Sequence, residues 1–293
     1  GDLVVPASKI NPKKINFMAK HGRGLICLAL TSRKVKRLNL PLMSLINKSR
    51  TQTAFTVSIE SKKGISTGIS AYDRSKTIKV AIKPSSTKKD IVSPGHVFPL
   101  VARSGGVLER AGHTEASVDI SRLSKINPSA VICEVMNEDG RMARLKDLQK
   151  FSRKHNIKIA SIEDLIAYRL RNEKLIFKLS TKNYSINKKK EYEFIIYQNK
   201  LNQLKNFVIK RGKFNSNKSI RVRVISTNVK NVKKLFDDYK IKKSFNYLSK
   251  FNNFVLIVIN NEKKDNTEKD NVILRYYGIG AQIIKDLKIR KMT

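Results

Sequence analysis

Tryptophan is absent from this 293-residue chain, cysteine occurs only twice, and no apolar run approaches the length of a membrane span. The most hydrophobic run, residues 254–259, suits a strand, whereas a bilayer needs about 20 apolar residues. Cys27 and Cys133 lie far apart in apolar surroundings, so we expect no disulfide framework. The first residues match neither a secretory signal nor a transit peptide. These absences predict a cytoplasmic protein without a membrane partner.

Acidic residues are also scarce, with 23 Asp and Glu against 61 Lys and Arg, which gives a net charge of +38. The basic excess is evenly spread: 32 basic and 13 acidic residues occur up to Asn172, and 29 and 10 occur after it. The sequence contains no zinc finger, helix-turn-helix pattern or row of stacking aromatics. We therefore expect no nucleic-acid partner, because charge alone governs solubility and non-specific contacts.

The length predicts two domains with sizeable cores. Residues 1–172 alternate strand-like apolar runs with amphipathic helical stretches, which indicates an α/β (α+β) sandwich with a mixed sheet and flanking helices. Residues 173–190 are polar and lysine-rich and are predicted to form a linker. Residues 191–293 are richer in strand patterns and predict a smaller α+β domain. Ten of the thirteen glycines precede residue 173, so we expect the chemistry in the first domain.

Local patterns predict the individual elements. In the first domain we expect strands at residues 24–30, 55–59, 97–101, 130–135 and 157–160. Helices are predicted to begin at Asn11-Pro12, at Asp73, at His113 and at Ser161. In the second domain we expect strands at residues 192–197, 207–210, 220–225, 254–259 and 272–276.

His96 stands between Gly95 and a predicted strand, framed by Pro94 and Pro99. This setting places the imidazole at a junction between a loop and a strand. Such a histidine can exchange protons near neutral pH. The alternative is a partly buried histidine that is hydrogen-bonded to backbone.

A glycine-rich segment, residues 103–115, leads directly into a predicted helix. The free N–H groups and the dipole of a helix N-terminus favour an anion. Arg110 could meet a phosphate with its planar fork of donors, Thr114 could donate its hydroxyl, and His113 could hold a divalent cation. The alternative is a glycine turn in which Thr114 only caps the helix.

Glu134 interrupts an apolar run, since Val131 to Cys133 precede it and Val135 and Met136 follow. A carboxylate on a strand that is buried on both faces needs a partner or a catalytic task. We therefore consider Glu134 a candidate general acid or base. A structural salt bridge is the alternative.

Taken together, these segments resemble 3,4-dihydroxy-2-butanone 4-phosphate synthase. The resemblance runs in order through residues 1–172. It also includes Gly1-Asp2, the run from His21 to Leu28, the run from Phe55 to Ile59, Thr67-Gly68-Ile69-Ser70-Ala71 and Asp73-Arg74. It implies a lyase of riboflavin biosynthesis that converts D-ribulose 5-phosphate into L-3,4-dihydroxy-2-butanone 4-phosphate and formate. It further implies Mg²⁺ or Mn²⁺ as cofactor and a homodimer with the active site at its interface.

The resemblance also assigns roles to particular residues. His96 and Glu134 match the catalytic positions, and His113 matches a metal ligand. The substrate contacts match Asp2, Arg110, Ala111, Gly112, His113, Thr114 and Glu134. Cys27 falls near the family's site, although an inert packed thiol is equally expected. Family members begin upstream of Gly1 with a strand and an acidic loop that supplies a metal-binding Glu. We therefore expect the sequence as given to lack part of its metal site and to be a poor catalyst.

The second domain resembles GTP cyclohydrolase II in residues 220–226 and 274–287. That enzyme needs three thiolates around Zn²⁺. Residues 173–293 contain no cysteine and no histidine, and Ile225 stands where the family has a histidine. We expect neither Zn²⁺ nor GTP hydrolysis, and we interpret this domain as a degenerate cyclohydrolase whose Gly-Ile-Gly-Ala turn at residues 278–281 serves packing.

Two other functions remain as alternatives to the enzyme. One is a catalytically decayed scaffold or interaction protein, which would have no reason to keep His96, Arg110, His113, Thr114 and Glu134 together. The other is a basic nucleic-acid-binding protein, for which steep salt dependence would be diagnostic.

Overall fold

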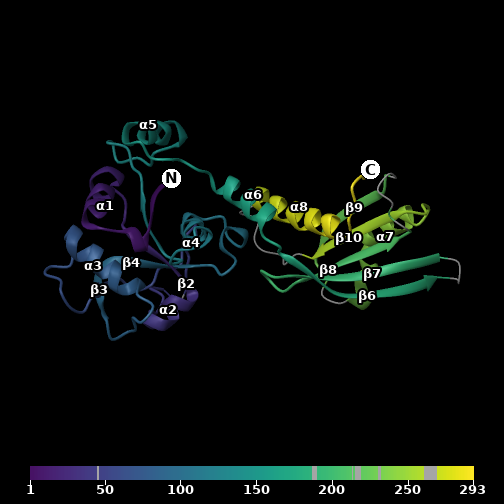
Figure 1. Cartoon of the computed structure of the whole chain (residues 1–293), viewed down its shortest axis with the longest axis horizontal. Helices are drawn as coiled ribbons and strands as arrows, with labels where there is room; N and C mark the ends of the chain where they lie inside the picture. Colours follow the sequence, from purple (N-terminus) through teal and green to yellow (C-terminus); the bar gives the residue numbers. More distant parts are fainter. Residues whose placement is uncertain (45, 187–189, 213, 215–218, 230–231, 261–268) are drawn as a thin grey trace. The chain divides into compact units, whose positions relative to one another are not determined.

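The computed structural model describes residues 1–44, 46–186, 190–212, 214, 219–229, 232–260 and 269–293. The chain forms two compact units, residues 1–165 and 166–293, and the boundary falls within helix α6 (Figure 1). Both units combine a five-stranded mixed sheet with helices, which confirms the predicted fold class.

The first unit contains β1 (Asp2–Pro6), α1 (Pro12–Phe17), β2 (Cys27–Thr31), α2 (Ser32–Leu38), β3 (Ile59–Ser61), α3 (Ala71–Ile82), β4 (Ile91–Ala102), α4 (His113–Leu123), β5 (Ala130–Glu134), α5 (Leu145–His155) and the start of α6 (Ile162–Asn172). Short helical turns lie at Ala7–Lys9, Met18–Gly22 and Gly106–Leu108. The strand order is β1-β5-β2-β4-β3, with β2 and β4 parallel and the other neighbours antiparallel.

Helix starts in this unit follow from local hydrogen bonds. The Asn11 side chain accepts from the Lys14 N–H, and Pro12 occupies the first helical position, as predicted. The prediction that a helix begins at Asp73 is wrong: Ser70 caps α3 by accepting from the Asp73 N–H at 3.0 Å, so Asp73 lies inside the first turn. Asp73 instead accepts hydrogen bonds from the loop that precedes the helix.

The sheet of the first unit is covered on both faces. Leu28, Leu30 and Val131 pack with α1, α2 and α3 in the main core. On the opposite face, Ala29 and Ala102 pack against Val118 of α4. Cys27 and Ile132 lie on this second face, because side chains alternate along a strand. The N-terminus of α4 therefore approaches the end of the sheet where β5 finishes.

Three sequence predictions for this unit need correction. Residues 157–160 form no strand but connect α5 to α6, whose first turn is capped by Ser161. Of the predicted strand at 55–59 only Ile59 belongs to a strand, β3, while Phe55 and Thr56 make isolated bridges. Strand β1 and helix α5 were not predicted. Apolar alternation alone did not separate these short, partly exposed segments.

The second unit contains the end of α6, β6 (Ile176–Ile186), β7 (Lys190–Asn199), β8 (Lys205–Arg211), β9 (Arg221–Thr227), a short helical turn (Val232–Asp237), α7 (Tyr239–Leu248), β10 (Phe254–Asn260) and α8 (Lys269–Asp286). The strand order is β6-β7-β8-β10-β9, with only the β9–β10 pair parallel among the described strands. Central β10 is apolar on both faces. Phe254, Leu256 and Val258 face a core with α7, whereas Val255, Ile257 and Ile259 face a core with α8.

Three predictions for the second unit are wrong. Most of the predicted linker is strand β6, paired with β7, and residues 187–189 of that segment lie outside the described residues. The predicted strand at 272–276 is part of helix α8. The predicted turn at 278–281 is also helical, and a methyl group at Gly278 would lie 2.6 Å from Leu170. Close packing between α6 and α8 therefore explains that glycine.

No helix in the described part of the chain is both long and apolar enough to cross a membrane.

Candidate active site

Three of the predicted site residues meet at the end of the first unit's sheet. Asp2 on β1 pairs directly with Glu134 on β5. The Nδ1 atom of His113, the first residue of α4, lies 3.3 Å from Asp2 Oδ1. Asp2 is almost buried, and burial raises the pKa of its carboxyl. The charge of His113 lowers this pKa by less than burial raises it, and the charge of Glu134 raises it further. The fold thus gathers two carboxylates and an imidazole in one place.

Glu134 is fixed by the turn that precedes β2. Its Oε2 atom accepts from the Leu25 N–H at 2.9 Å. Gly24 lies so close that an added methyl group would be 2.6 Å from both Glu134 O and Glu134 Oε2. The predicted full burial of Glu134 is wrong, because the side chain is only half-buried at the end of its strand. No basic side chain is recorded in an ion pair with it in the described structure, so the salt-bridge alternative loses its support.

His96 points to the same end and face of the sheet. From Cys27 the register leads to Ile132 on β5 and to Phe98 on β4. Glu134 and His96 each lie two residues from those positions, toward the same end, so alternation places them on one face. The His96 Nδ1 atom is hydrogen-bonded to Glu60 on β3. The sequence left open a histidine that is hydrogen-bonded to backbone. In the structure the partner of Nδ1 is a carboxylate instead.

Glu60 was not predicted from the sequence. Its partner is 36 positions away, so only the pairing of β3 with β4 reveals the contact. The only hint of Glu60 in the sequence is the pair of glycines Gly68 and Gly95. In the structure both lie closer to Glu60 than a residue with a side chain could.

The segment before α4 is built differently from the prediction. Gly112 is the N-cap residue of α4. Thr114 is the second residue of the helix, is buried, and does not cap it. Arg110 is pinned: its Nη1 donates to Glu115 Oε2 at 2.6 Å and its Nη2 donates to the Thr51 carbonyl at 2.8 Å. Glu115 is almost fully buried and also accepts from the Arg103 N–H. The segment is therefore held rigidly around the helix N-terminus, where an anion is favoured.

Cys27 lies beneath the site but is a packed thiol. It is 2% exposed, and burial raises its pKa far above that of a free cysteine, with further rises from Glu134 and Asp2. A nucleophilic cysteine needs a lowered pKa instead. Both cysteines are free and buried.

His113, the expected metal ligand, has the Asp2 carboxylate as its neighbour. In the described residues, no set of three or more His, Cys, Asp or Glu side chains is gathered closely enough to hold an ion. An imidazole beside a carboxylate nevertheless offers donors that suit a divalent cation.

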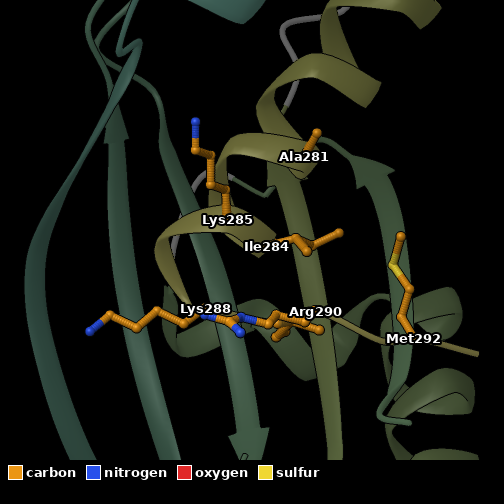
Figure 2. Close-up of a pocket in the computed structure, with 7 residues that line it drawn as sticks. Ala281, Ile284, Lys285, Lys288, Arg290 and Met292 are labelled. Atoms are coloured by element: carbon orange, nitrogen blue, oxygen red, sulfur yellow. The ribbon is translucent and has the colours of Figure 1, made fainter. Parts of the chain in front are cut away.

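The second unit presents a basic hollow of about 610 Å³ beside the end of α8 (Figure 2). Lys285 and Lys288 extend away from each other in Figure 2, so their charges do not converge on one ligand position. Ile225 is packed in the core of this unit. The polar groups that do converge are those of the first unit.

Comparison with known proteins gives the family. The family model of 3,4-dihydroxy-2-butanone 4-phosphate synthase matches residues 1–168. The riboflavin biosynthesis protein RibBA of Aquifex aeolicus is 42% identical, with 100% of this chain and 79% of that protein covered. The 3,4-dihydroxy-2-butanone 4-phosphate synthase of Photobacterium phosphoreum is 39% identical, with coverage of 100% and 85%.

Two solved structures extend the comparison. RibBX of A. baumannii, described as a two-domain 3,4-dihydroxy-2-butanone 4-phosphate synthase, has 36% identity and a TM-score of 0.83, covering 100% of this chain and 84% of its own. A 3,4-dihydroxy-2-butanone 4-phosphate synthase in complex with two magnesium ions has 37% identity and a TM-score of 0.55, covering 58% and 85%. This chain belongs to the 3,4-dihydroxy-2-butanone 4-phosphate synthase family of riboflavin biosynthesis.

Proposed function

We propose that this protein converts D-ribulose 5-phosphate into L-3,4-dihydroxy-2-butanone 4-phosphate and formate. One observation carries the proposal: Asp2, Glu134 and His113 converge at one end of the sheet in a chain of the synthase family. The reaction divides a five-carbon phosphate into a four-carbon phosphate and formate without any other reactant. The site therefore has to move protons and to hold the oxygens of the substrate while the carbon skeleton rearranges.

A divalent cation fits these residues. Burial raises the pKa of Asp2, and the negative charge of Glu134 raises it further. The two neighbouring carboxylates would favour a positive charge beside them. His113 would hold the ion, with Asp2 adding negative charge 3.3 Å from its ring nitrogen. Bound Mg²⁺ or Mn²⁺ would polarise neighbouring oxygens of the substrate. The magnesium ions in the related structure support this assignment.

The remaining roles follow from burial and position. His96 and Glu134 exchange protons with the substrate, His96 through a half-exposed imidazole. Asp2 contacts the substrate and holds a proton on its carboxylate more readily than an exposed Asp would, because burial raises its pKa. Arg110, Ala111, Gly112, His113 and Thr114 form the phosphate cradle. The N-terminus of α4 supplies much of its affinity, since Arg110 already binds Glu115.

The assembly and location are also proposed here. His96 and His113 are 44% and 49% exposed, which supports a homodimer in which a second copy covers the site. We propose the first unit, residues 1–165, as the synthase domain, followed by a second domain that begins within α6 and includes β6. Two free, buried thiols support a cytoplasmic location.

The second domain, in this proposal, does not hydrolyse GTP. Hydrolysis through thiolate-bound zinc needs cysteines, and residues 173–293 contain neither cysteine nor histidine. We assign it a structural role. Release of formate and pyrophosphate from GTP by the purified protein would overturn this assignment.

Formate release from D-ribulose 5-phosphate with Mg²⁺, measured by a coupled assay, tests the proposed function. The product is identified by NMR. We expect turnover by the wild-type protein and a loss of about 10²–10⁴-fold in the His96→Gln and Glu134→Gln variants. A decayed scaffold would give no turnover in any of the three proteins. The exposed variant Glu163→Gln serves as a control and should keep wild-type activity.

A further inference from the structure

Glu60 and His96 form a carboxylate–imidazole pair at the candidate active site. The Glu60 carboxylate contacts His96 Nδ1 directly, and its side chain is 16% exposed, whereas the imidazole is 44% exposed. A carboxylate accepts hydrogen bonds, so the proton of a neutral imidazole is held on Nδ1. The Nε2 atom then carries the lone pair that can take a proton from a ligand. Glu60 lies behind the histidine, on the less exposed side of the pair.

Two glycines let the backbone close over this pair. Gly68 has a φ of +83°, and a methyl group there would overlap the Glu60 carboxylate and lie 2.8 Å from His96 Nδ1. A methyl group at Gly95 would collide with the Ile59 carbonyl and with the Glu60 side chain. Both approaches are possible only without a side chain. The pair is thus enclosed by backbone, which limits the rotamers that Glu60 can adopt.

Asp73 holds the loop that carries Gly68. Its Oδ2 accepts from the Gly68 N–H at 3.0 Å and from the Ser66 hydroxyl at 2.9 Å, and its Oδ1 accepts from the Ser66 N–H at 3.2 Å. These hydrogen bonds, led by that of the Ser66 side chain, lower the pKa of Asp73. Asp73 is itself 6% exposed on α3. The loop is therefore fixed to a helix by an ionised side chain.

We propose that Glu60 is a positioning residue for His96. Its carboxylate fixes the Nδ1–H tautomer and the ring orientation, and the Gly68 loop, anchored by Asp73, keeps the carboxylate in place. His96 Nε2 is then the atom that exchanges protons with the substrate. A buried carboxylate behind a catalytic imidazole acts in this way in hydrolases, where it also stabilises the imidazolium that forms. This inference rests on the proposed function for its kinetic part and on the structure alone for the tautomer.

Two variants separate the charge of Glu60 from its hydrogen bond. Glu60→Gln keeps an oxygen that can accept from Nδ1–H but removes the charge. Glu60→Ala removes both. We expect kcat to fall about 10²–10⁴-fold in Glu60→Ala, with KM changed much less, because the group acts on proton transfer. In Glu60→Gln we expect a smaller loss. The acid limb of its pH–rate profile should shift to lower pH, because the imidazolium loses a neighbouring negative charge.

Imidazole NMR of the whole protein tests the tautomer without any activity. The chain has only four histidines, and His96→Gln identifies the resonance of interest. We expect the Nδ1–H tautomer in the wild type and in Glu60→Gln, and a mixture richer in Nε2–H in Glu60→Ala. An unchanged tautomer in Glu60→Ala overturns the proposal even if the enzyme is active. If the wild type shows no turnover, the proposed function fails while the tautomer result still decides the role of Glu60. Glu163→Gln is the matched control and should change neither measurement.

Discussion

Asp2 and Glu134 stand directly opposite each other on neighbouring strands, with their side chains on one face of the sheet. Like charges that face each other across a strand pair are destabilising. The neighbouring charge of Glu134 indeed adds to the effect of burial in raising the pKa of Asp2. His113 opposes this rise from 3.3 Å away. The two facing carboxylates therefore lower the stability of the folded protein at the site where the proposed reaction needs them.

The first prediction is that Asp2→Asn makes the protein more stable at neutral pH while it abolishes formate release. The pKa of Asp2 is raised above its unfolded value near 3.8, so the folded state binds a proton more readily than the unfolded state does. Its carboxylate therefore costs stability as pH rises through the folded pKa. Removing the charge should therefore raise the melting temperature at pH 7.

Thermal unfolding measured between pH 3.5 and 7.5 checks this. The advantage of Asp2→Asn should be largest at neutral pH and should shrink toward pH 4. Asp139→Asn is the control, because Asp139 is 58% exposed and Asn can still accept from the Arg141 N–H. A melting temperature for Asp2→Asn below that of the wild type at pH 7 would contradict the argument.

The second prediction concerns Gly24, which touches Glu134. Gly24→Ala places a methyl group 2.6 Å from Glu134 Oε2, so the carboxylate must move and lose its bond from the Leu25 N–H. We expect activity to fall at least tenfold, with a stability loss of about 1–3 kcal/mol. Gly140→Ala is the matched control. Gly140 has a φ of +81° with no atom near its added methyl group, so this variant should lose stability but keep its activity.

The sequence predicts the element that carries His113 well. Helix α4 begins at His113, as predicted from the glycine-rich segment that leads into it. The central strand β10 was also predicted, because a short, continuous apolar run is typical of a strand that is buried on both faces. The convergence of Asp2, Glu134 and His113 came from the family resemblance, and the structure brings them together.

The failures have two physical causes. Residues 272–276 contain β-branched and aromatic side chains that favour a strand, yet they are helical, so tertiary context overrides propensity there. Strand β6 has many polar and lysine residues because it lies at the edge of its sheet, and this composition suggested a linker. The Glu60–His96 contact could not be predicted, since it depends on strand pairing with a register shift between Ile59 and Glu60.

The third prediction is a loss of stability in mild acid, caused by two neighbouring histidines. The His21 and His155 rings lie 4.8 Å apart, and Phe17 and Phe151 pack beside them at the contact between α1 and α5. Burial lowers the pKa of His21, and His155, Lys20, Lys154 and Arg23 lower it further through their charges. The acids Glu138 and Asp147 line the same hollow.

Because the folded pKa of His21 is below its unfolded value, the unfolded state takes up the proton first as pH falls below about 6.5. Stability is therefore fully present above that pH and declines as pH falls toward the folded pKa. As pH falls from 7.5 to 5.5, we expect the amides of α5 to lose protection against hydrogen exchange, measured relative to the intrinsic exchange rate at each pH, and α5 to become easier to cleave by a protease that is active at both pH values. His21→Gln should weaken this pH dependence, and an identical dependence in that variant would disprove the role of His21.

The fourth prediction tests a buried ion pair in the second unit. Arg169 is 2% exposed, and its Nε and Nη2 each donate to a different oxygen of Glu173 at 2.8 Å. Glu173→Ala removes the carboxylate and leaves a buried guanidinium without this compensation, which costs about 3–5 kcal/mol in such settings. Adding Arg169→Met should restore much of the stability, because Met fills a similar volume without charge. The midpoint of urea unfolding measures both variants.

Asp139→Ala, which breaks an exposed pair with Arg141, should cost less than about 1 kcal/mol. If the double variant is no more stable than Glu173→Ala, the loss comes from Glu173 itself and not from the loss of this partner by the arginine.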